Sequence, residues 1–103
     1  MTAQLDVRAG TDPDFGRRVR IEIVEILGSG RCSIGLKPGA AWLVDSPTVP
    51  AGMCMWAWAS LTPFLTPLRF GGSLPWEDEP MTARVCCPDP GNPVVFRLSV
   101  LGE

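Results

Sequence analysis

The chain has 103 residues, a length that fits one small domain built around a single core. Hydrophobic residues make up 46% of it and charged residues 19%, which argues against disorder and leaves apolar surface available for self-association. The net charge is −2 and no basic run is longer than Arg17-Arg18, so the chain lacks the positive patch that binds a phosphate backbone. We therefore expect no nucleic-acid partner.

Missing residue types restrict the chemistry further. The chain contains no histidine and no tyrosine, and its one lysine is Lys37. These side chains are the usual bases and proton shuttles of catalysis near neutral pH. A Ser-His-Asp or Cys-His catalytic site is therefore excluded, as is any metal site that requires imidazole.

The N-terminal segment has no apolar stretch of signal-peptide length, and no run in the chain is long enough to span a bilayer. We expect a cytoplasmic protein with no membrane partner, in which the four cysteines are mainly thiols. Residues 1–16 are polar and rich in turn-forming residues, and they predict a flexible N-terminal arm. A single domain is expected over residues 17–103.

The first predicted element is a strand. Residues 17–27 alternate apolar and polar side chains, and the apolar phase switches near Ile23-Val24, which indicates a bulge or the end of the strand. Glycines and a Pro-Gly turn then divide residues 28–45 into short β-like pieces. We expect a β-ribbon there, with its second piece at 41–45.

A single segment is typical of a helix. Residues 50–61 contain no β-branched residue, begin with a proline and place Cys54 and Trp58 on one apolar stripe, which predicts a helix over residues 51–62. Pro63 and Pro67 should end or kink this helix, because proline lacks the backbone N–H that a helix interior needs.

Two further strands are predicted near the end of the chain, at residues 82–87 and 94–101. A loop with Gly71-Gly72 and Trp76 precedes them. Together these elements predict an α+β fold, a small antiparallel sheet of about four strands with one main helix packed across it.

The motifs occur in a recognisable order. They are Gly-x-Cys at Cys32 and again at Cys54, Arg-Phe-Gly-Gly from Arg69, Leu-Pro-Trp ending at Trp76, and Cys-Pro-Asp-Pro from Cys87. Over residues 19–103 this order resembles a family of small prokaryotic proteins of unknown function. The resemblance implies no particular reaction.

The same resemblance implies that Cys32, Cys54 and Cys87 are the cysteines of the family and that Cys86 is additional. Many members of the family carry one histidine at the position of Leu36 and another near Ala59, and this chain has neither. Any metal or acid–base role of those histidines therefore does not carry over.

Strand alternation separates the two adjacent cysteines. Neighbouring residues in a strand point to opposite faces, so if Val85 faces the core, Cys87 does too and Cys86 faces away. Cys54 lies on the helix stripe and Cys32 opens the ribbon, and we expect these two to converge with Cys87 beneath the sheet.

Four roles remain open for the converging cysteines. They could be small core residues, since free cysteine is among the most buried residue types. They could form a three-thiolate site for a soft metal ion, completed by Asp89. Cys87 could be a reactive thiol presented by the proline-rich turn that follows it, or two cysteines could form a disulfide.

Cys87 and Asp89 are the candidate catalytic residues. Asp89 lies at the mouth of a rigid turn, and partial burial among prolines would raise the pKa of its carboxyl group and suit it to donate a proton. Its alternative role is to cap backbone N–H groups of its own turn, as aspartate commonly does.

The candidate ligand-binding residues are Cys32, Cys54, Trp58, Arg69 and Trp76. Trp58 could equally belong to the core, and Trp56 lies almost opposite it around the helix, so the two cannot face the same core. Arg69 next to Gly71-Gly72 could hold a carboxylate, and its alternative is an ion pair with one of the acids at 77–79.

These residues predict a small-molecule-binding or catalytic domain with an apolar pocket lined by tryptophan and thiol groups, working without a cofactor. Its chemistry would be shape-directed cyclisation, isomerisation or thiol addition, as in secondary metabolism. A non-enzymatic thiolate metal-binding or redox accessory protein is the alternative, and a structural subunit is a third. We also expect a homo-oligomer, most simply a dimer.

Overall fold

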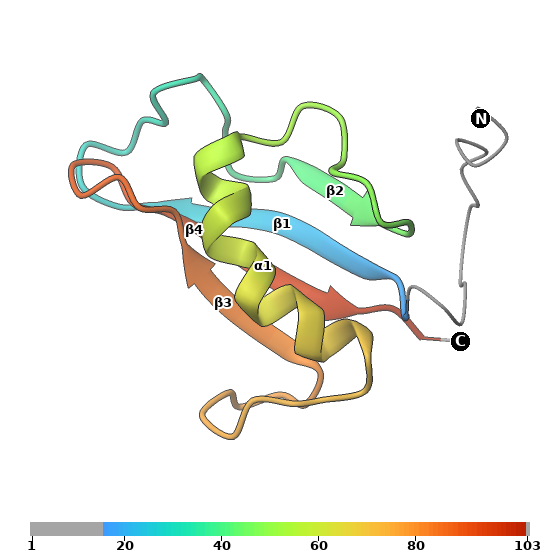
Figure 1. Cartoon of the computed structure of the whole chain (residues 1–103). Helices are drawn as coiled ribbons and strands as arrows, with labels where there is room; N and C mark the ends of the chain where they lie inside the picture. The colour runs from blue at the N-terminus through green and yellow to red at the C-terminus, as the bar shows by residue number, and fades with distance from the viewer. Residues whose placement is uncertain (1–15, 103) are drawn as a thin grey trace, which may run out of the picture.

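The computed structural model describes residues 16–102, which form one antiparallel sheet with a single helix across one face (Figure 1). The elements in chain order are β1 (Val19–Ile26), β2 (Ala41–Val44), α1 (Met55–Arg69), β3 (Thr82–Cys86) and β4 (Val94–Val100). The predicted α+β class with four strands and one main helix is confirmed. The predicted arm at 1–16 lies outside the described residues except for Gly16.

The sheet has the order β2-β1-β4-β3, so β1 and β4 are the central strands. They pair along nearly their whole length, with Ile21 opposite Leu98, and the register shifts between Ile23 and Glu25. This shift is the bulge that the apolar phase change predicts, and it leaves Val24 largely exposed.

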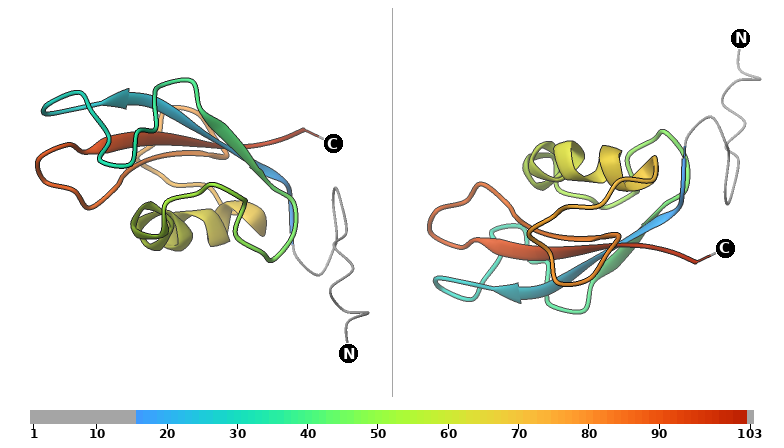
Figure 2. Two further views of the ribbon diagram at one scale, coloured as in Figure 1. Left: turned by 90° about the horizontal axis from the view of Figure 1, so that it is seen from above. Right: turned by 90° about the horizontal axis from the view of Figure 1, so that it is seen from below.

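The core lies between the sheet and α1. Alternate residues of the strands point toward the helix, and α1 meets them with one apolar stripe, so within residues 16–102 no helix covers the other face of the sheet (Figure 2). The buried residues are Val19, Ile21, Ile23, Val44, Ala57, Leu61, Leu65, Leu68, Ala83, Val85, Val94, Phe96 and Leu98. Each large side chain buried in this way contributes about 1.5–3 kcal/mol to stability.

The bounds of α1 differ from those predicted. The helix begins at Met55 rather than near residue 51, and it continues through both prolines to Arg69. Of the two predicted effects of Pro63 and Pro67, an end or a kink of the helix, the end does not occur. Burial of leucines on both sides of the prolines stabilises the continued helix, which offsets the lost hydrogen bonds.

A side chain partly replaces the bond lost at the first proline. Pro63 cannot donate to the carbonyl of Ala59, but the hydroxyl of Thr62 lies 3.5 Å from that oxygen and donates to it. The hydroxyl of Thr66 donates to the carbonyl of Thr62 at 3.1 Å, but the carbonyl that Pro67 leaves without its usual donor is that of Pro63. The threonine before the first proline therefore satisfies the orphaned carbonyl, and the threonine before the second does not.

Glycines, not prolines, end α1. Phe70 is the C-cap, Gly71 follows with a φ of +94°, and the N–H of Gly72 donates to the carbonyl of Pro67 at 2.8 Å. A left-handed residue followed by this backbone bond is the Schellman arrangement, which satisfies carbonyls that a helix end leaves free.

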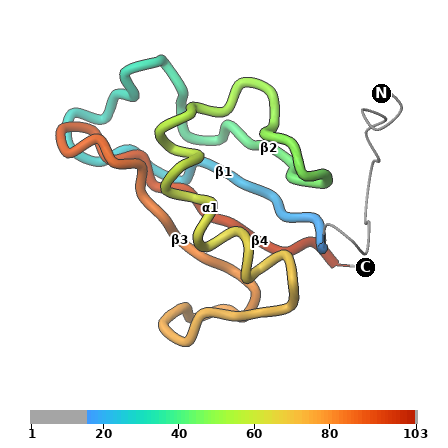
Figure 3. Tube along the Cα trace, viewed as in Figure 1, coloured from blue at the N-terminus to red at the C-terminus, as the bar shows by residue number. Residues whose placement is uncertain are grey.

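The connection between β1 and β2 contains no strand over residues 27–40, so the first piece of the predicted ribbon does not form. The connection is a long loop. It lies at the same end of the sheet as the β3–β4 turn and the start of α1 (Figure 3). Among the described residues no helix combines the length and apolarity that crossing a bilayer requires.

Candidate functional site

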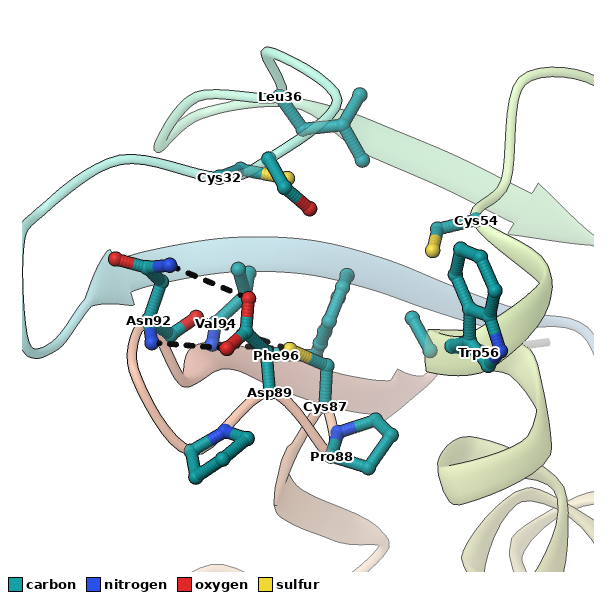
Figure 4. A pocket seen from close by; sticks show the side chains of 13 residues that line it. Cys32, Leu36, Cys54, Trp56, Cys87, Pro88, Asp89, Asn92, Val94 and Phe96 are labelled. Atoms are coloured by element: carbon teal, nitrogen blue, oxygen red, sulfur yellow. Dashed lines mark hydrogen bonds between the residues drawn. The ribbon is translucent and has the colours of Figure 1, made fainter.

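A pocket of about 340 Å³ lies at this end of the sheet. Three segments form its walls: the β1–β2 connection, the first turn of α1 with the residue before it, and the β3–β4 turn, while β4 forms the floor (Figure 4). The lining residues are Cys32, Ser33, Leu36, Cys54, Trp56, Ala57, Cys87, Pro88, Asp89, Pro90, Asn92, Val94 and Phe96.

All three of the cysteines that were expected to converge line this pocket, each from a different segment. They are Cys32, Cys54 and Cys87. Cys86 is exposed at the end of β3 and does not line it. All four cysteines are free thiols in the structure. The period-two pattern at 85–87 thus separates the neighbouring cysteines as predicted.

The backbone of β4 holds the thiol of Cys87. The N–H of Val94 donates to Cys87 Sγ at 3.3 Å, while the N–H of Cys87 donates to the Val94 carbonyl at 2.9 Å. These two bonds close the β3–β4 turn at its base. They fix the direction of the sulfur within the pocket wall (Figure 4).

Asp89 accepts hydrogen bonds from its own turn. Its Oδ1 accepts the N–H of Gly91 at 2.9 Å and that of Asn92 at 3.3 Å, and its Oδ2 accepts the side-chain amide of Asn92 at 3.3 Å. The bond from the Asn92 side chain, followed by that from Gly91, holds the pKa of Asp89 below its usual value. The expected rise in this pKa was wrong, and the turn-capping role is the one observed.

Backbone contacts tie the β1–β2 connection to the β3–β4 turn. Leu27 N–H donates to the Pro93 carbonyl at 2.8 Å, and Ser29 N–H donates to the Gly91 carbonyl at 3.4 Å. Between them Gly28 has a φ of +64°, and a Cβ atom there would collide with the Gly91 oxygen. Glycine is required at this position because the two backbones approach too closely for a side chain.

Three of the predicted ligand-binding residues do not line the pocket: the two tryptophans Trp58 and Trp76, and Arg69. Trp58 is half-buried and packs against the core. Trp76 is 65% exposed, and its ring meets that of Phe64 edge-on at a centroid distance of 6.5 Å. The pocket walls include neither tryptophan.

Arg69 joins the end of α1 to other segments. It donates to the carbonyl of Ser46 at 3.2 Å and to that of Arg17 at 3.4 Å. Burial lowers the pKa of Arg69, and Asp45 opposes that shift. Two of the three predicted alternative partners of Arg69 are used elsewhere, since the carboxylates of Glu77 and Glu79 accept bonds from β3 and β4.

Sequence reasoning missed the tryptophan that does line the pocket, Trp56, which is 63% exposed. The cause is the helix start: with Met55 as the first residue, Cys54 is the N-cap and Trp56 lies in the first turn beside it. The sequence did contain a sign of this position. Trp56 and Trp58 cannot face the same core, so one of the two had to face a ligand, a partner subunit or solvent.

The donor set does not form a metal centre. Among residues 16–102, no group of three or more Cys, Asp or Glu side chains is close enough to hold an ion together. The three thiols therefore share one cavity without forming a common coordination shell.

Fold and site together define a small α+β protein with a thiol-lined apolar pocket. Comparisons of the chain with protein-family models, with curated proteins and with solved structures found no match. The resemblance of its motifs to a prokaryotic family stays a prediction, and the function has to be argued from the pocket itself.

Proposed function

We propose that this protein binds an apolar small molecule in the three-cysteine pocket. One observation carries the proposal: a cavity of about 340 Å³ in which three thiols from distant segments meet the apolar side chains of Leu36, Trp56 and Phe96. Cavities of roughly 300–1,000 Å³ with mainly apolar walls are typical of small-ligand sites.

The polar groups in the walls favour binding over acid–base catalysis. Apart from the thiols, Asp89 is the ionisable side chain among the described lining residues, and its lowered pKa makes it a poor proton donor at neutral pH. Cyclisation or isomerisation at this site would have to depend on substrate shape and desolvation. Binding needs only the pocket.

The cysteines supply the test. Alkylation of each cysteine by N-ethylmaleimide, followed by peptide mass spectrometry, is compared with and without a panel of neutral one- and two-ring aromatic alcohols. We expect a bound alcohol to slow alkylation of Cys32, Cys54 and Cys87 severalfold while Cys86, which lies outside the pocket, reacts at an unchanged rate.

A matched pair of tryptophans controls for exposed aromatic surface. Trp56→Leu should weaken protection because Trp56 lines the pocket, whereas Trp76→Leu should not, although both side chains are about equally exposed at 63% and 65%. If no compound in the panel protects any pocket cysteine, or if both variants behave alike, the proposal is wrong.

A further inference from the structure

We infer that the ligand of this pocket carries a positively charged head group, which lies at Asp89 while its apolar body lies against Trp56. The inference rests on the proposed function and adds the charge class of the ligand. It combines the position of one carboxylate with the distribution of charge around the cavity.

Asp89 is the charged residue among the described side chains that line the pocket, and no lysine or arginine is among them. Figure 4 shows its side chain rising from the β3–β4 turn into the space enclosed by the three segments. Arg31 and Lys37 belong to the β1–β2 connection but line an adjoining hollow. The pocket itself therefore presents a negative charge.

Nothing described around Asp89 neutralises that charge. Its hydrogen-bond donors, the backbone N–H groups of Gly91 and Asn92 and the amide of Asn92, are all uncharged. They lower the pKa and so keep the carboxylate ionised at neutral pH. Its Oδ2 accepts one bond, from the Asn92 amide, so it can accept another from a ligand.

The opposite wall decides the orientation of the ligand. The N-terminus of α1 lies on the Cys54 and Trp56 side, and its first turn contains no acidic residue. The positive end of the helix dipole disfavours a cation there. An ammonium group is thus directed to Asp89, while the exposed ring of Trp56 offers aromatic surface to the apolar body and the buried Phe96 lies in the floor beneath it.

Three probes with one naphthalene body test the charge preference: 2-naphthylmethylammonium, 2-naphthalenemethanol and 2-naphthoate. Their affinities are measured at low salt and pH 7 by calorimetry, with cysteine protection locating the bound probe. We expect the ammonium to bind roughly threefold to tenfold tighter than the alcohol, as for one partly exposed charge pair, and the carboxylate to bind weakest.

Asp89→Asn keeps an acceptor oxygen for the turn but removes the charge, so the preference for the ammonium over the alcohol should disappear. Asp78→Asn is the matched control, because it removes the same charge from an exposed site outside the pocket. If Asp89→Asn does not fold, added salt should reduce the ammonium preference of the wild-type protein without changing alcohol binding.

The two proposals fail in different ways. Equal binding of ammonium and alcohol by the wild-type protein, or tighter binding of naphthoate, overturns the charge assignment and leaves the binding pocket standing. Persistence of the ammonium preference in Asp89→Asn overturns it as well. If none of the three probes binds or protects a cysteine, both proposals are wrong.

Discussion

Gly28 is the residue at which two walls of the pocket touch through their backbones. We expect Gly28→Ala to lower the free energy of unfolding by about 2 kcal/mol or more, because the new methyl group adds a collision with the Gly91 oxygen to the strain of a left-handed residue. Urea unfolding monitored by tryptophan fluorescence measures the loss.

Gly30→Ala is the matched control for this prediction. Gly30 also has a positive φ, +78°, but no atom lies within 4 Å of the position a Cβ would take. Its replacement should cost only the conformational strain, about 1–2 kcal/mol. Equal losses for the two variants would show that the Gly28–Gly91 approach does not stabilise the protein.

Asp89 predicts a pH dependence of stability. Its pKa is lower in the folded than in the unfolded chain, so the carboxylate stabilises the fold above the unfolded value of about 3.9, and this contribution disappears as the pH falls through the folded pKa. Between about pH 5 and pH 2 the melting temperature of the wild-type protein should therefore fall more than that of Asp89→Asn. Parallel profiles would contradict the role of Asp89 as a cap.

At the scale of single residues, the sequence predicted well what a strict period determines. Alternation assigned Cys86 and Cys87 to opposite faces because one residue step always reverses the side chain in a strand. The pKa of Asp89 was predicted in the wrong direction, because desolvation by prolines was weighed without the hydrogen bonds that the turn supplies. Such bonds depend on a turn geometry that the sequence pattern does not specify.

At the scale of elements, α1 contains a proline whose replacement should stabilise the protein. Pro63 is exposed in the middle of the helix, so Pro63→Ala restores the N–H bond to the Ala59 carbonyl without disturbing buried packing. We expect the free energy of unfolding to rise by about 1–3 kcal/mol. The gain is smaller than the full helix cost of proline, because alanine gives the unfolded chain more conformational freedom than proline does.

Urea unfolding of Pro63→Ala measures this effect, and circular dichroism checks that helix content is retained. A loss of stability would mean that Pro63 maintains a bend on which the contacts of α1 with the sheet depend. Pro67→Ala should gain less, because Pro67 is half-buried and contacts Gly72.

The same helix shows where element prediction failed. The helix was predicted to end at residue 62 because a proline follows. That prediction considered the hydrogen bond lost at the proline but not the burial of Leu65 and Leu68 in the next turns. The error at the start had a consequence for the site, since it placed Cys54 within the helix and hid Trp56. Strand bounds were accurate to one or two residues because alternation ends where the turns begin.

At the scale of the whole molecule, exposed aromatic surface predicts self-association. Met55, Trp56, Phe70 and Trp76 are each at least 60% exposed. We expect a dimer at high protein concentration in multi-angle light scattering, and a weaker one for Trp56→Ala if that face is used. A monomer at all concentrations, or an unchanged dimer in Trp56→Ala, would exclude this surface as the interface.

The α+β class was predictable because four short β patterns and one helical pattern can bury their apolar faces in few ways. The sequence also predicted that Cys32, Cys54 and Cys87 converge, but not the path by which the three segments that carry them meet at one end of the sheet. It depends on the long β1–β2 connection, whose glycine-rich sequence is compatible with many paths, and on contacts such as Leu27 with Pro93 that join residues far apart in the chain.

The strand order also constrains when the protein can fold during synthesis. β1 is made early, but its principal partner β4 comes more than sixty residues later, since Val19 pairs with Val100. Until β4 leaves the ribosome, the four residues of β2 are the only strand partner of β1 within the part of the chain that the structure describes, and a two-stranded ribbon of that size is at best marginally stable. The nascent chain should therefore stay sensitive to protease through β3 and become resistant in one late step, once residue 100 has emerged.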